Sequence, residues 1–269
     1  DALREWAERE WPTQKALRAL IKETTDEPDH SPIIKPSDNW NFSDPKFQSI
    51  HDGVKEGVIP GDLYANILWY YSRPDDVVYC PMAGSGQIIR VWNERSEWMK
   101  PDVWNITLIA SDLTPRGPYK DQIVPCDIAT GACIDHADLI VMDLPYFGMV
   151  NGQYSDSSAD MANAATVEQW RGFLEKIAPV CRRIQSEGGR VVTVCPNYVD
   201  WEAGRQVLTS DMVRRTFTQA GYELTGLAYS SRRIQQTQGI DMARNNKQAK
   251  ERRLPLSDMA EVAVFTAMP

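Results

Sequence analysis

The residues best suited to chemistry lie near the middle of the chain, where an apolar run ends in an acid. The run 139–142 is followed directly by Asp143, Leu144, Pro145 and Tyr146. Such a run predicts a buried strand, and parallel α/β sheets bind ligands at the carboxyl ends of their strands. A carboxylate that accepts a hydrogen bond, followed by a ring that can stack, suits a planar target with an exocyclic amine. A nucleobase has this chemistry.

A second group of candidates lies about 60 residues earlier, in a loop that contains two glycines. The loop follows an apolar run at 77–80 that predicts another strand. Glycine lets backbone amides approach a ligand closely, although such loops are also common as structural turns. The candidate ligand-binding residues of this loop are Cys80, Pro81, Ala83, Gly84, Ser85 and Gly86. The six-residue dinucleotide fingerprint is not met, so the loop alone is a weak signal.

Acids at the ends of the next two predicted elements strengthen that signal. Asp112 follows the strand 106–111, where an acid in a Rossmann-like sheet can bind ribose hydroxyls. Asp127 ends the following segment, where an acid can reach an adenine amino group. We therefore include Asp112, Leu113, Asp127 and Ile128 among the cofactor-binding candidates. The alternative for both acids is a helix cap or a solvated surface position.

The order of the predicted elements indicates the fold class. Strands are predicted at 77–80, 106–111, 139–142, 190–195, 223–229 and 261–266, and helices at 62–71, 87–92, 166–186 and 210–220. This alternation predicts an α/β fold with a mostly parallel, doubly wound sheet and an antiparallel strand near the C-terminus. Residues 1–46 are predicted to be a helical N-terminal extension and linker, and residues 47–269 the catalytic domain. We expect Trp40 in the extension to pack rather than to stack on a base.

Composition and charge narrow the functional classes. The 269-residue chain is 42% hydrophobic and has no apolar stretch long enough to cross a membrane, so we expect a cytoplasmic protein without membrane contact. Its five cysteines include no CxxC pair, and three lie in strand-like contexts, which favours buried thiols over a metal or redox site. The three histidines are scattered singly, and we predict no metal.

Basic residues concentrate near the C-terminus, although the net charge of the chain is −8. The segment 228–253 has seven basic residues against two acidic ones, and its basic residues are Arg232, Arg233, Arg244, Lys247, Lys250, Arg252 and Arg253. This concentration favours contacts with the phosphates and base edges of nucleic acid over a solvated face. We expect Arg232 and Arg233 to bind substrate. The polar loop 151–163 is either a plain surface loop or a lid that nucleic acid orders.

These residues resemble motifs of the S-adenosylmethionine-dependent DNA amino-methyltransferases, which modify adenine N6 or cytosine N4. Residues 77–86 resemble motif I, Asp143-Leu144-Pro145-Tyr146 resembles the catalytic Asp-Pro-Pro-Tyr motif IV, and the helix at 59–71 lies where motif X lies. The resemblance covers about residues 59–198. It implies a Rossmann-like class I methyltransferase fold with S-adenosyl-L-methionine as the cofactor. No long target-recognition domain fits between the two motifs, so the chain looks most like the compact adenine-methylating members.

The resemblance also implies roles for the residues around motif IV. Asp143 and the carbonyl of Leu144 would accept hydrogen bonds from the target amine, next to Pro145. Tyr146, helped by Phe147, would stack on a base flipped out of its helix. DNA is the expected partner, ahead of RNA. The N-terminal helices are a candidate surface for a partner protein or for self-association.

Two departures from the family pattern define the alternatives. Cys80 stands where the family usually has an acid that helps to hold the methionine end of the cofactor, and Leu144 replaces the first proline of motif IV. Cytosine N4 in DNA and guanine N2 in RNA are alternative targets, because some guanine-N2 RNA methyltransferases have a similar Asp-Leu-Pro-aromatic-Gly run. The alternative of another class is a methyltransferase-like nucleic-acid-binding subunit that has lost catalysis.

Overall fold

The computed structural model describes residues 34–42, 45–47, 50, 59–99, 104–147, 155–231, 239–257 and 259–269, with side chains in all of these except 239–245. All described residues belong to one compact unit, Ile33–Pro269. The predicted N-terminal helices, with the partner surface expected on them, lie outside the described residues. Arg232 and Arg233 also lie outside them.

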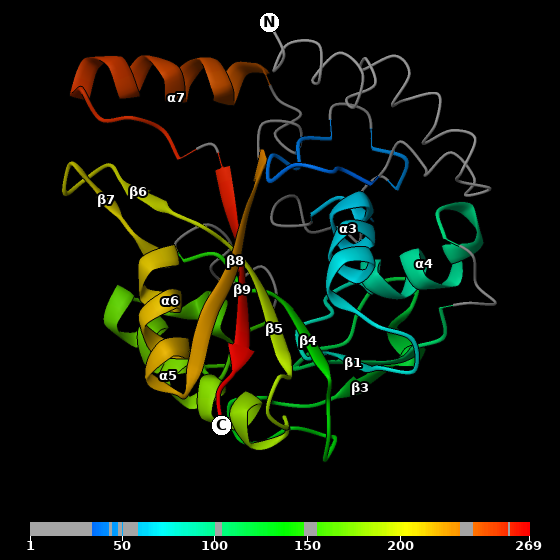
Figure 1. Ribbon diagram of the computed structural model, residues 1–269. Helices are drawn as coiled ribbons and strands as arrows, with labels where there is room; N and C mark the ends of the chain where they lie inside the picture. The colour runs from blue at the N-terminus through cyan, green and yellow to red at the C-terminus, as the bar shows by residue number, and fades with distance from the viewer. Residues whose placement is uncertain are drawn as a thin grey trace, which may run out of the picture. The chain divides into compact units, whose positions relative to one another are not determined.

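A seven-stranded sheet forms the centre of this unit (Figure 1), in the order β3-β2-β1-β4-β5-β9-β8. The strands are β1 (Val77–Cys80), β2 (Thr107–Asp112), β3 (Ile123–Pro125), β4 (Leu139–Asp143), β5 (Arg190–Pro196), β8 (Tyr222–Ser231) and β9 (Met259–Ala267). β9 runs antiparallel to both of its neighbours, and the other strands all run in one direction. This order, with one reversed strand near the end of the chain, is that of the Rossmann-like class I methyltransferase fold. The predicted fold class is confirmed.

Helices cover both faces of the sheet. These helices are α3 (Gly61–Tyr71), α4 (Gln87–Asn93), α5 (Val167–Arg183) and α6 (Thr209–Gln219). A further helix, α7 (Gly239–Arg252), lies beyond one edge of the sheet (Figure 1), and short 3₁₀ helices lie at Arg95–Glu97, Lys120–Gln122 and Met161–Asn163. α3 and α4 share a core with Val78, whereas α5 and α6 share a core with Tyr79. Consecutive strand residues point to opposite faces, which explains why these two neighbours enter different cores. The predicted doubly wound arrangement, with helices on both faces of the sheet, is therefore confirmed.

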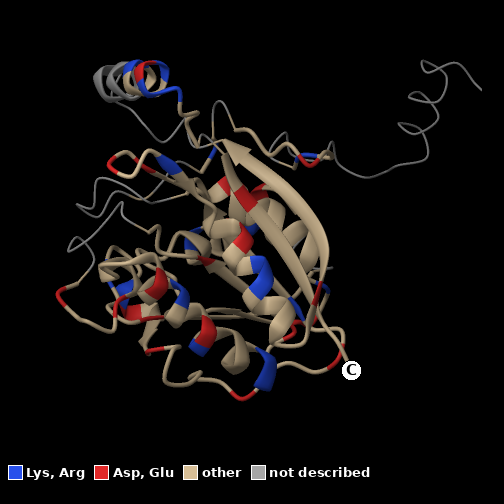
Figure 2. Cartoon of the chain, turned by 90° about the vertical axis from the view of Figure 1, so that its left-hand side faces the viewer, with Lys and Arg blue, Asp and Glu red and all other residues tan. Residues whose placement is uncertain are grey.

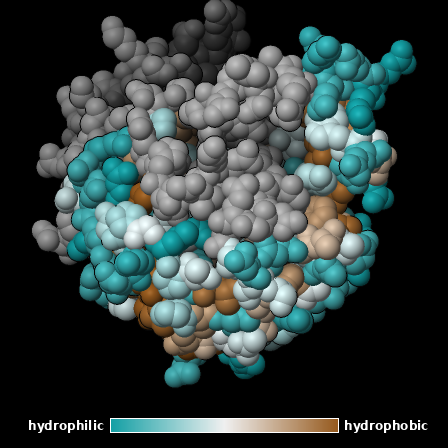
Figure 3. Space-filling model, turned by 180° about the vertical axis from the view of Figure 1, so that it is seen from behind, coloured by the Kyte–Doolittle hydropathy of each residue, from teal (hydrophilic) through white to brown (hydrophobic). Residues whose placement is uncertain are grey.

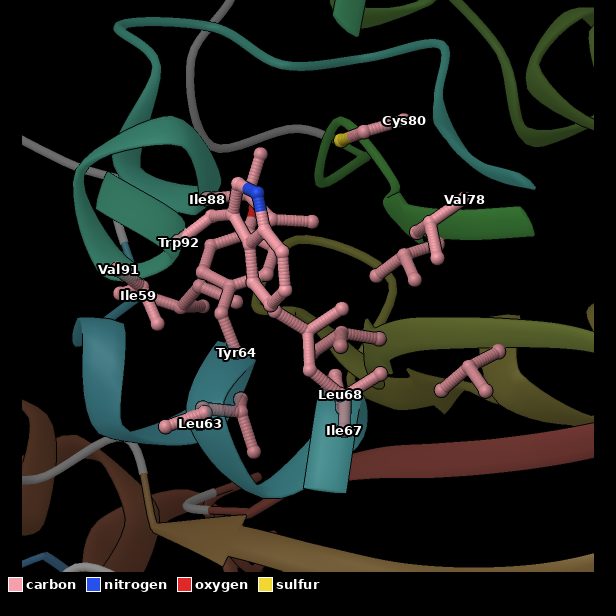
Figure 4. Close-up of a cluster of buried hydrophobic side chains, with 14 of the residues drawn as sticks. Ile59, Leu63, Tyr64, Ile67, Leu68, Val78, Cys80, Ile88, Val91 and Trp92 are labelled. Carbon is pink, nitrogen blue, oxygen red and sulfur yellow. The ribbon is translucent and has the colours of Figure 1, made fainter. Parts of the chain in front are cut away.

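The core between α3, α4 and the sheet is mostly aliphatic (Figure 4). Leu63 of α3 and Ile88 and Val91 of α4 are fully buried there. Gly61, at the start of α3, allows the close approach, because a Cβ at this position would lie 2.5 Å from Cβ of Phe47 and 2.7 Å from Cγ2 of Val91. α3 is therefore held closely against α4, and one of its residues lines a pocket at the edge of the sheet.

The described part of the segment before α3 packs on the sheet edge and on α3. The Trp40 amide donates to the Tyr229 carbonyl at 2.8 Å, and the Tyr229 amide donates to the Asp38 carbonyl at 2.7 Å. Trp40 is only 3% exposed, which confirms its predicted packing role. The buried carboxylate of Asp62 accepts the Phe47 amide at 2.7 Å. Residues that the sequence indicated as a linker thus contribute to the core.

Besides the short strand β3 and the 3₁₀ helices, two described elements were not expected from the sequence. One is a hairpin of β6 (Tyr198–Asp200) and β7 (Arg205–Val207), which follows β5 and forms its own two-stranded sheet. The other is α7, which lies in the connection between β8 and β9. Both elements follow the carboxyl end of a parallel strand, so they lie at the same edge of the sheet (Figure 1).

The described surface seen from behind is mainly hydrophilic, with hydrophobic residues in small groups between polar ones (Figure 3). The most exposed large hydrophobic side chains are Leu208 at 50% and Val124 at 45%. They lie on different parts of the fold, ahead of α6 and on the edge strand β3. No helix in the described part of the chain is both long and apolar enough to cross a membrane.

Candidate active site

The carboxyl ends of β1, β2, β3 and β4 open into one pocket. The residues of its wall that the sequence had indicated are Pro81, Ala83, Gly84, Ser85, Asp112, Leu113, Asp127, Ile128, Asp143, Leu144, Pro145 and Tyr146. These four strands are parallel neighbours, so residues that are distant in the sequence meet at one edge of the sheet. The predicted cofactor-binding and catalytic groups therefore share one cavity.

The glycine loop after β1 is tied to the end of β2. The Gly84 amide donates to Oδ2 of Asp112 at 2.8 Å, and the Ala83 amide donates to the Ser111 carbonyl at 3.0 Å. The Thr114 amide donates to Oδ1 of Asp112 at 2.9 Å. Gly84 has φ of +55°, a conformation that favours glycine. Asp112 therefore holds the glycine loop with one oxygen and the turn after β2 with the other, while its side chain lines the pocket.

The surroundings of Asp112 have opposing effects on the pKa of its carboxyl group. Burial, the largest effect, raises the pKa of its carboxyl group above the ordinary value, and the charge of Asp160 raises it further. The amides of Thr114 and Gly84 and the Arg116 guanidinium lower the pKa, but they do not cancel the effect of burial. A cationic or hydrogen-bond-donating ligand beside Asp112 would therefore stabilise its charged form.

The pocket carries an excess of negative charge. Among the described residues, four carboxylates line it, from Asp112, Asp127, Asp143 and Asp160, against one guanidinium, that of Arg116. In a partly enclosed site such an excess attracts a cation and disfavours a ligand that carries phosphates. The charge of the wall therefore argues against a dinucleotide cofactor. No group of three His, Cys, Asp or Glu side chains in the described part of the chain is arranged to hold a metal ion.

Asp127 also has a local structural role. Its Oδ1 accepts the Ala129 amide at 2.9 Å, and its carbonyl accepts the amide and the hydroxyl of Thr130 at 3.0 and 2.9 Å. These bonds form a turn that places Asp127 and the buried Ile128 in the pocket wall. The turn role and a role toward a ligand are compatible, because the turn uses one carboxylate oxygen and a carboxylate has two.

Leu144 makes a backbone hydrogen bond that a proline at this position could not make. Its amide donates to the Val194 carbonyl at 3.2 Å and thereby extends the contact between β4 and β5. Proline has no amide hydrogen and cannot make this bond. The Leu144 side chain is fully buried in the core that α5 and α6 cover. The departure from the Asp-Pro-Pro-Tyr pattern thus has a structural explanation, and Leu144 still lines the pocket.

Three predicted residues are not part of the pocket wall. Cys80 is fully buried, and burial raises the pKa of its thiol to about 12, so it offers no negative charge near neutral pH. Gly86, with φ of +87°, closes the turn against Tyr119. Phe147 packs edge-on against Tyr198, with ring centroids 5.3 Å apart. Cys80 and Gly86 thus contribute to the structure around the pocket and not to its surface.

The polar residues of the pocket wall that sequence reasoning missed include Tyr64, Arg116 and Asp160. Tyr64 lies on α3, among aliphatic side chains (Figure 4). Burial and the nearby charge of Asp143 raise the pKa of its hydroxyl, which therefore stays protonated. Asp160 lies in the loop predicted as a possible lid, and its Oδ1 accepts the Ala162 amide at 2.9 Å. The helical pattern around Tyr64 contained no signal that distinguishes a pocket residue from a core residue.

Basic residues lie at the end of α7 (Figure 2), and their side chains are exposed. We call this group the α7 basic cluster, and its members are Lys247, Lys250, Arg252 and Arg253. The Arg252 guanidinium donates to the Trp201 carbonyl in the hairpin, and Gln206 donates to the Pro255 carbonyl at 3.0 Å. These bonds join α7 and its following turn to the β6–β7 hairpin. Because β8 and β4 are parallel, the cluster lies beyond the sheet edge that holds the pocket.

Solved structures that align with the chain include methyltransferases, all at low similarity. No protein-family model matches the sequence, and no curated protein matches it. TrmN from Thermus thermophilus aligns over 78% of this chain and 49% of its own, with 13% identity and a TM-score of 0.47. A methyltransferase from Pyrococcus furiosus aligns over 78% and 84%, with 11% identity and a TM-score of 0.42.

A TehB-like SAM-dependent methyltransferase from Corynebacterium glutamicum aligns over 76% of this chain and 86% of its own, with 16% identity and a TM-score of 0.40. The chain spans about half the length of TrmN. At these identities and TM-scores the likenesses carry no inference about activity or substrate. Any assignment of function therefore depends on the strand order and on the residues of the pocket.

Proposed function

We propose that this protein transfers a methyl group from S-adenosyl-L-methionine to an exocyclic amino group of a nucleic-acid base, with adenine N6 in DNA as the target. The observation that carries the proposal is the shared pocket. The Asp143 to Tyr146 segment at the end of β4 and the Gly84 loop at the end of β1 line the same cavity in a class I methyltransferase fold. A cofactor and a planar amine can therefore meet there.

The charge and shape of the pocket fit this cofactor. Asp112, Asp127 and Ile128 line the pocket. In the proposal, Asp112 would accept hydrogen bonds from ribose hydroxyls, and Asp127 and Ile128 would contact the adenine ring. The negative wall suits a ligand with a sulfonium and an ammonium group. Arg116 is a cation of the wall and suits a carboxylate. When bound, the cofactor supplies a methyl group on a positively charged sulfur, which is already activated for transfer.

The residues at the end of β4 would prepare the accepting nitrogen. An exocyclic base nitrogen is a poor nucleophile, because its lone pair is delocalised into the ring. Hydrogen bonds from its two protons to the Asp143 carboxylate and the Leu144 carbonyl favour a more pyramidal nitrogen. Tyr146, which is 4% exposed and lines the pocket, would stack on the base and align it for in-line transfer. Asp143 is also positioned to accept the proton that the nitrogen releases.

Cys80 does not prevent this assignment. The family acid that it replaces would meet the methionine end of the cofactor, and the buried thiol offers no charge there. Tyr64 and Arg116 are polar groups of the wall that can bind this end instead. The proposal therefore predicts measurable cofactor binding. A titration that detects none would favour the alternative of a nucleic-acid-binding subunit without catalysis.

Nucleic acid is the proposed partner of the α7 basic cluster. The pocket itself is acidic, so the phosphates must be bound outside it, and the cluster lies beyond the same sheet edge. Lys250→Ala should weaken DNA binding and lower the slope of affinity against salt by about one unit. Arg183→Ala is the matched control, because Arg183 is exposed at the end of α5, which leads to the opposite sheet edge. Equal effects of the two changes would contradict this role.

Transfer of labelled methyl groups tests the function and the target together. The wild-type chain is incubated with labelled cofactor and with double-stranded DNA, single-stranded DNA or RNA, and the products are digested to nucleosides. The proposal predicts N6-methyl-2′-deoxyadenosine from DNA. Label in N4-methyl-2′-deoxycytidine from DNA or in N2-methylguanosine from RNA would move the assignment to another base. Cofactor binding without transfer to any of the three would contradict the proposed activity.

A further inference from the structure

Trp170 contacts the candidate catalytic segment from the core side. It lies in the first part of α5, after the Thr166 N-cap, and is fully buried. Its indole Nε1 donates a hydrogen bond to the Pro145 carbonyl at 2.9 Å. Trp170 does not line the pocket, so it cannot touch a ligand there. It acts on the site only through the backbone of the segment.

Two hydrogen bonds hold the backbone on either side of the Leu144 carbonyl. On one side, the Leu144 amide is bound to the Val194 carbonyl at 3.2 Å. On the other side, Trp170 holds the Pro145 carbonyl. The proline ring fixes φ of Pro145 and peptide groups are planar, so holding the Pro145 carbonyl also restricts the Leu144–Pro145 peptide plane. The direction of the Leu144 carbonyl is therefore restricted from both sides.

We infer that Trp170 is a positioning residue that aims the Leu144 carbonyl at the amine of the target base. The inference rests on the proposed function, in which this carbonyl accepts one of the two amine protons. A carbonyl that turns away would leave the nitrogen with one acceptor, Asp143, and with a less favourable geometry for transfer. Misplacement of about 1 Å at a reacting centre can cost about a hundredfold in rate.

A second tryptophan in the chain provides a matched control. Trp98 is also buried, at 3% exposure, and its Nε1 donates to the Val91 carbonyl at 3.2 Å. It belongs to the core on the other face of the sheet and does not line the pocket. Trp98→Phe and Trp170→Phe therefore remove the same group from the same kind of bond, but only the second bond reaches the catalytic segment.

The test compares both variants with the wild type in methyl transfer, cofactor binding and thermal unfolding. Trp170→Phe should lower kcat at least about tenfold, with the KM for DNA and the cofactor Kd within about twofold of wild type. Trp98→Phe should leave kcat within about twofold while lowering the unfolding midpoint as much as Trp170→Phe does. Equal kcat in the two variants would overturn the positioning role. An inactive wild type would instead overturn the proposed function, and the inference with it.

A second substitution, closer to tryptophan in shape, keeps the test decisive if Trp170→Phe does not fold. Trp170→benzothienylalanine replaces the indole N–H by sulfur and keeps the size and shape of the side chain. The positioning role predicts the same loss of kcat in this variant, with wild-type cofactor binding as the sign of a folded protein. Wild-type kcat in this variant would overturn the role, because the hydrogen bond alone has been removed.

Discussion

The backbone amide of Gly84 donates a hydrogen bond to the carboxylate of Asp112 at 2.8 Å. The bond joins the glycine loop of one strand to the end of its neighbour, across 28 positions of sequence. The same carboxylate accepts the Thr114 amide, so the acid that faces the pocket also shapes its floor. A change at Asp112 should therefore affect both cofactor binding and the loop.

Asp112→Asn should weaken cofactor binding by at least about tenfold. The amide has one acceptor oxygen where the carboxylate has two, so either Gly84 or Thr114 loses its partner, at a cost of about 1–3 kcal/mol. Calorimetric titration with the cofactor measures the loss. Asp121→Asn is the control, because Asp121 is an exposed acid that does not line the pocket. Wild-type affinity in Asp112→Asn would refute the role of this carboxylate.

Gly86→Ala should destabilise the protein more than Gly188→Ala does. Both glycines have positive φ, +87° and +78°, so both changes include a similar backbone strain of roughly 1–2 kcal/mol. A Cβ at Gly86 would lie 2.6 Å from Cβ of Tyr119, whereas nothing lies within 4 Å of a Cβ at Gly188. The clash should add about 1–3 kcal/mol. Equal losses in chemical denaturation would show that the turn relaxes without cost.

Leu144→Ala should reduce stability but leave methyl transfer per folded molecule within a few fold. The side chain packs in the core, and the proposed chemistry uses only the backbone carbonyl, so truncation should cost about 2–5 kcal/mol of unfolding free energy. Leu174→Ala, a fully buried change in the same core and outside the pocket, is the control. A loss of kcat that is specific to Leu144→Ala would mean that this side chain acts in the site.

The buried thiol of Cys80 should contribute to alkaline unfolding. Burial raises its pKa from 9.0 to about 12, so the unfolded chain releases this proton before the folded chain does. The stabilising contribution is therefore complete below pH 9 and is lost as the pH rises toward 12. Cys80→Ala should reduce the fall in unfolding free energy between about pH 8 and about pH 10.5. Cys181→Ala provides an independent repeat, because burial raises that thiol pKa to about 12 as well. An unchanged pH dependence in both variants would contradict the prediction.

The strands and the pocket edge could be predicted from the sequence because their signals are local. The apolar run before Asp143 and the glycines after Cys80 mark strand ends, and parallel strands bring such ends together. The same local pattern could not show that Cys80 points into the core while Pro81 reaches the pocket. That difference depends on the alternation of side chains at the last strand residue.

Other parts of the site depend on contacts between distant residues. Tyr64 becomes a pocket residue only because α3 packs under the ends of the strands, and its helical pattern resembles that of any core residue. The bond from Trp170 to the Pro145 carbonyl joins positions 25 apart and has no sequence signature. The β6–β7 hairpin was missed because its strands are three residues long, too short for a periodic pattern.

The proposed function depends above all on the Asp143 carboxylate accepting a hydrogen bond from the target amine. Comparing labelled methyl transfer to DNA by the wild type and by Asp143→Ala tests this most directly, because alanine removes both acceptor oxygens. Asp135→Ala, at an exposed position outside the pocket, serves as the control. We expect Asp143→Ala to lose at least about a hundredfold in kcat, with cofactor affinity within a few fold of wild type. Transfer by Asp143→Ala at the wild-type rate would contradict this role.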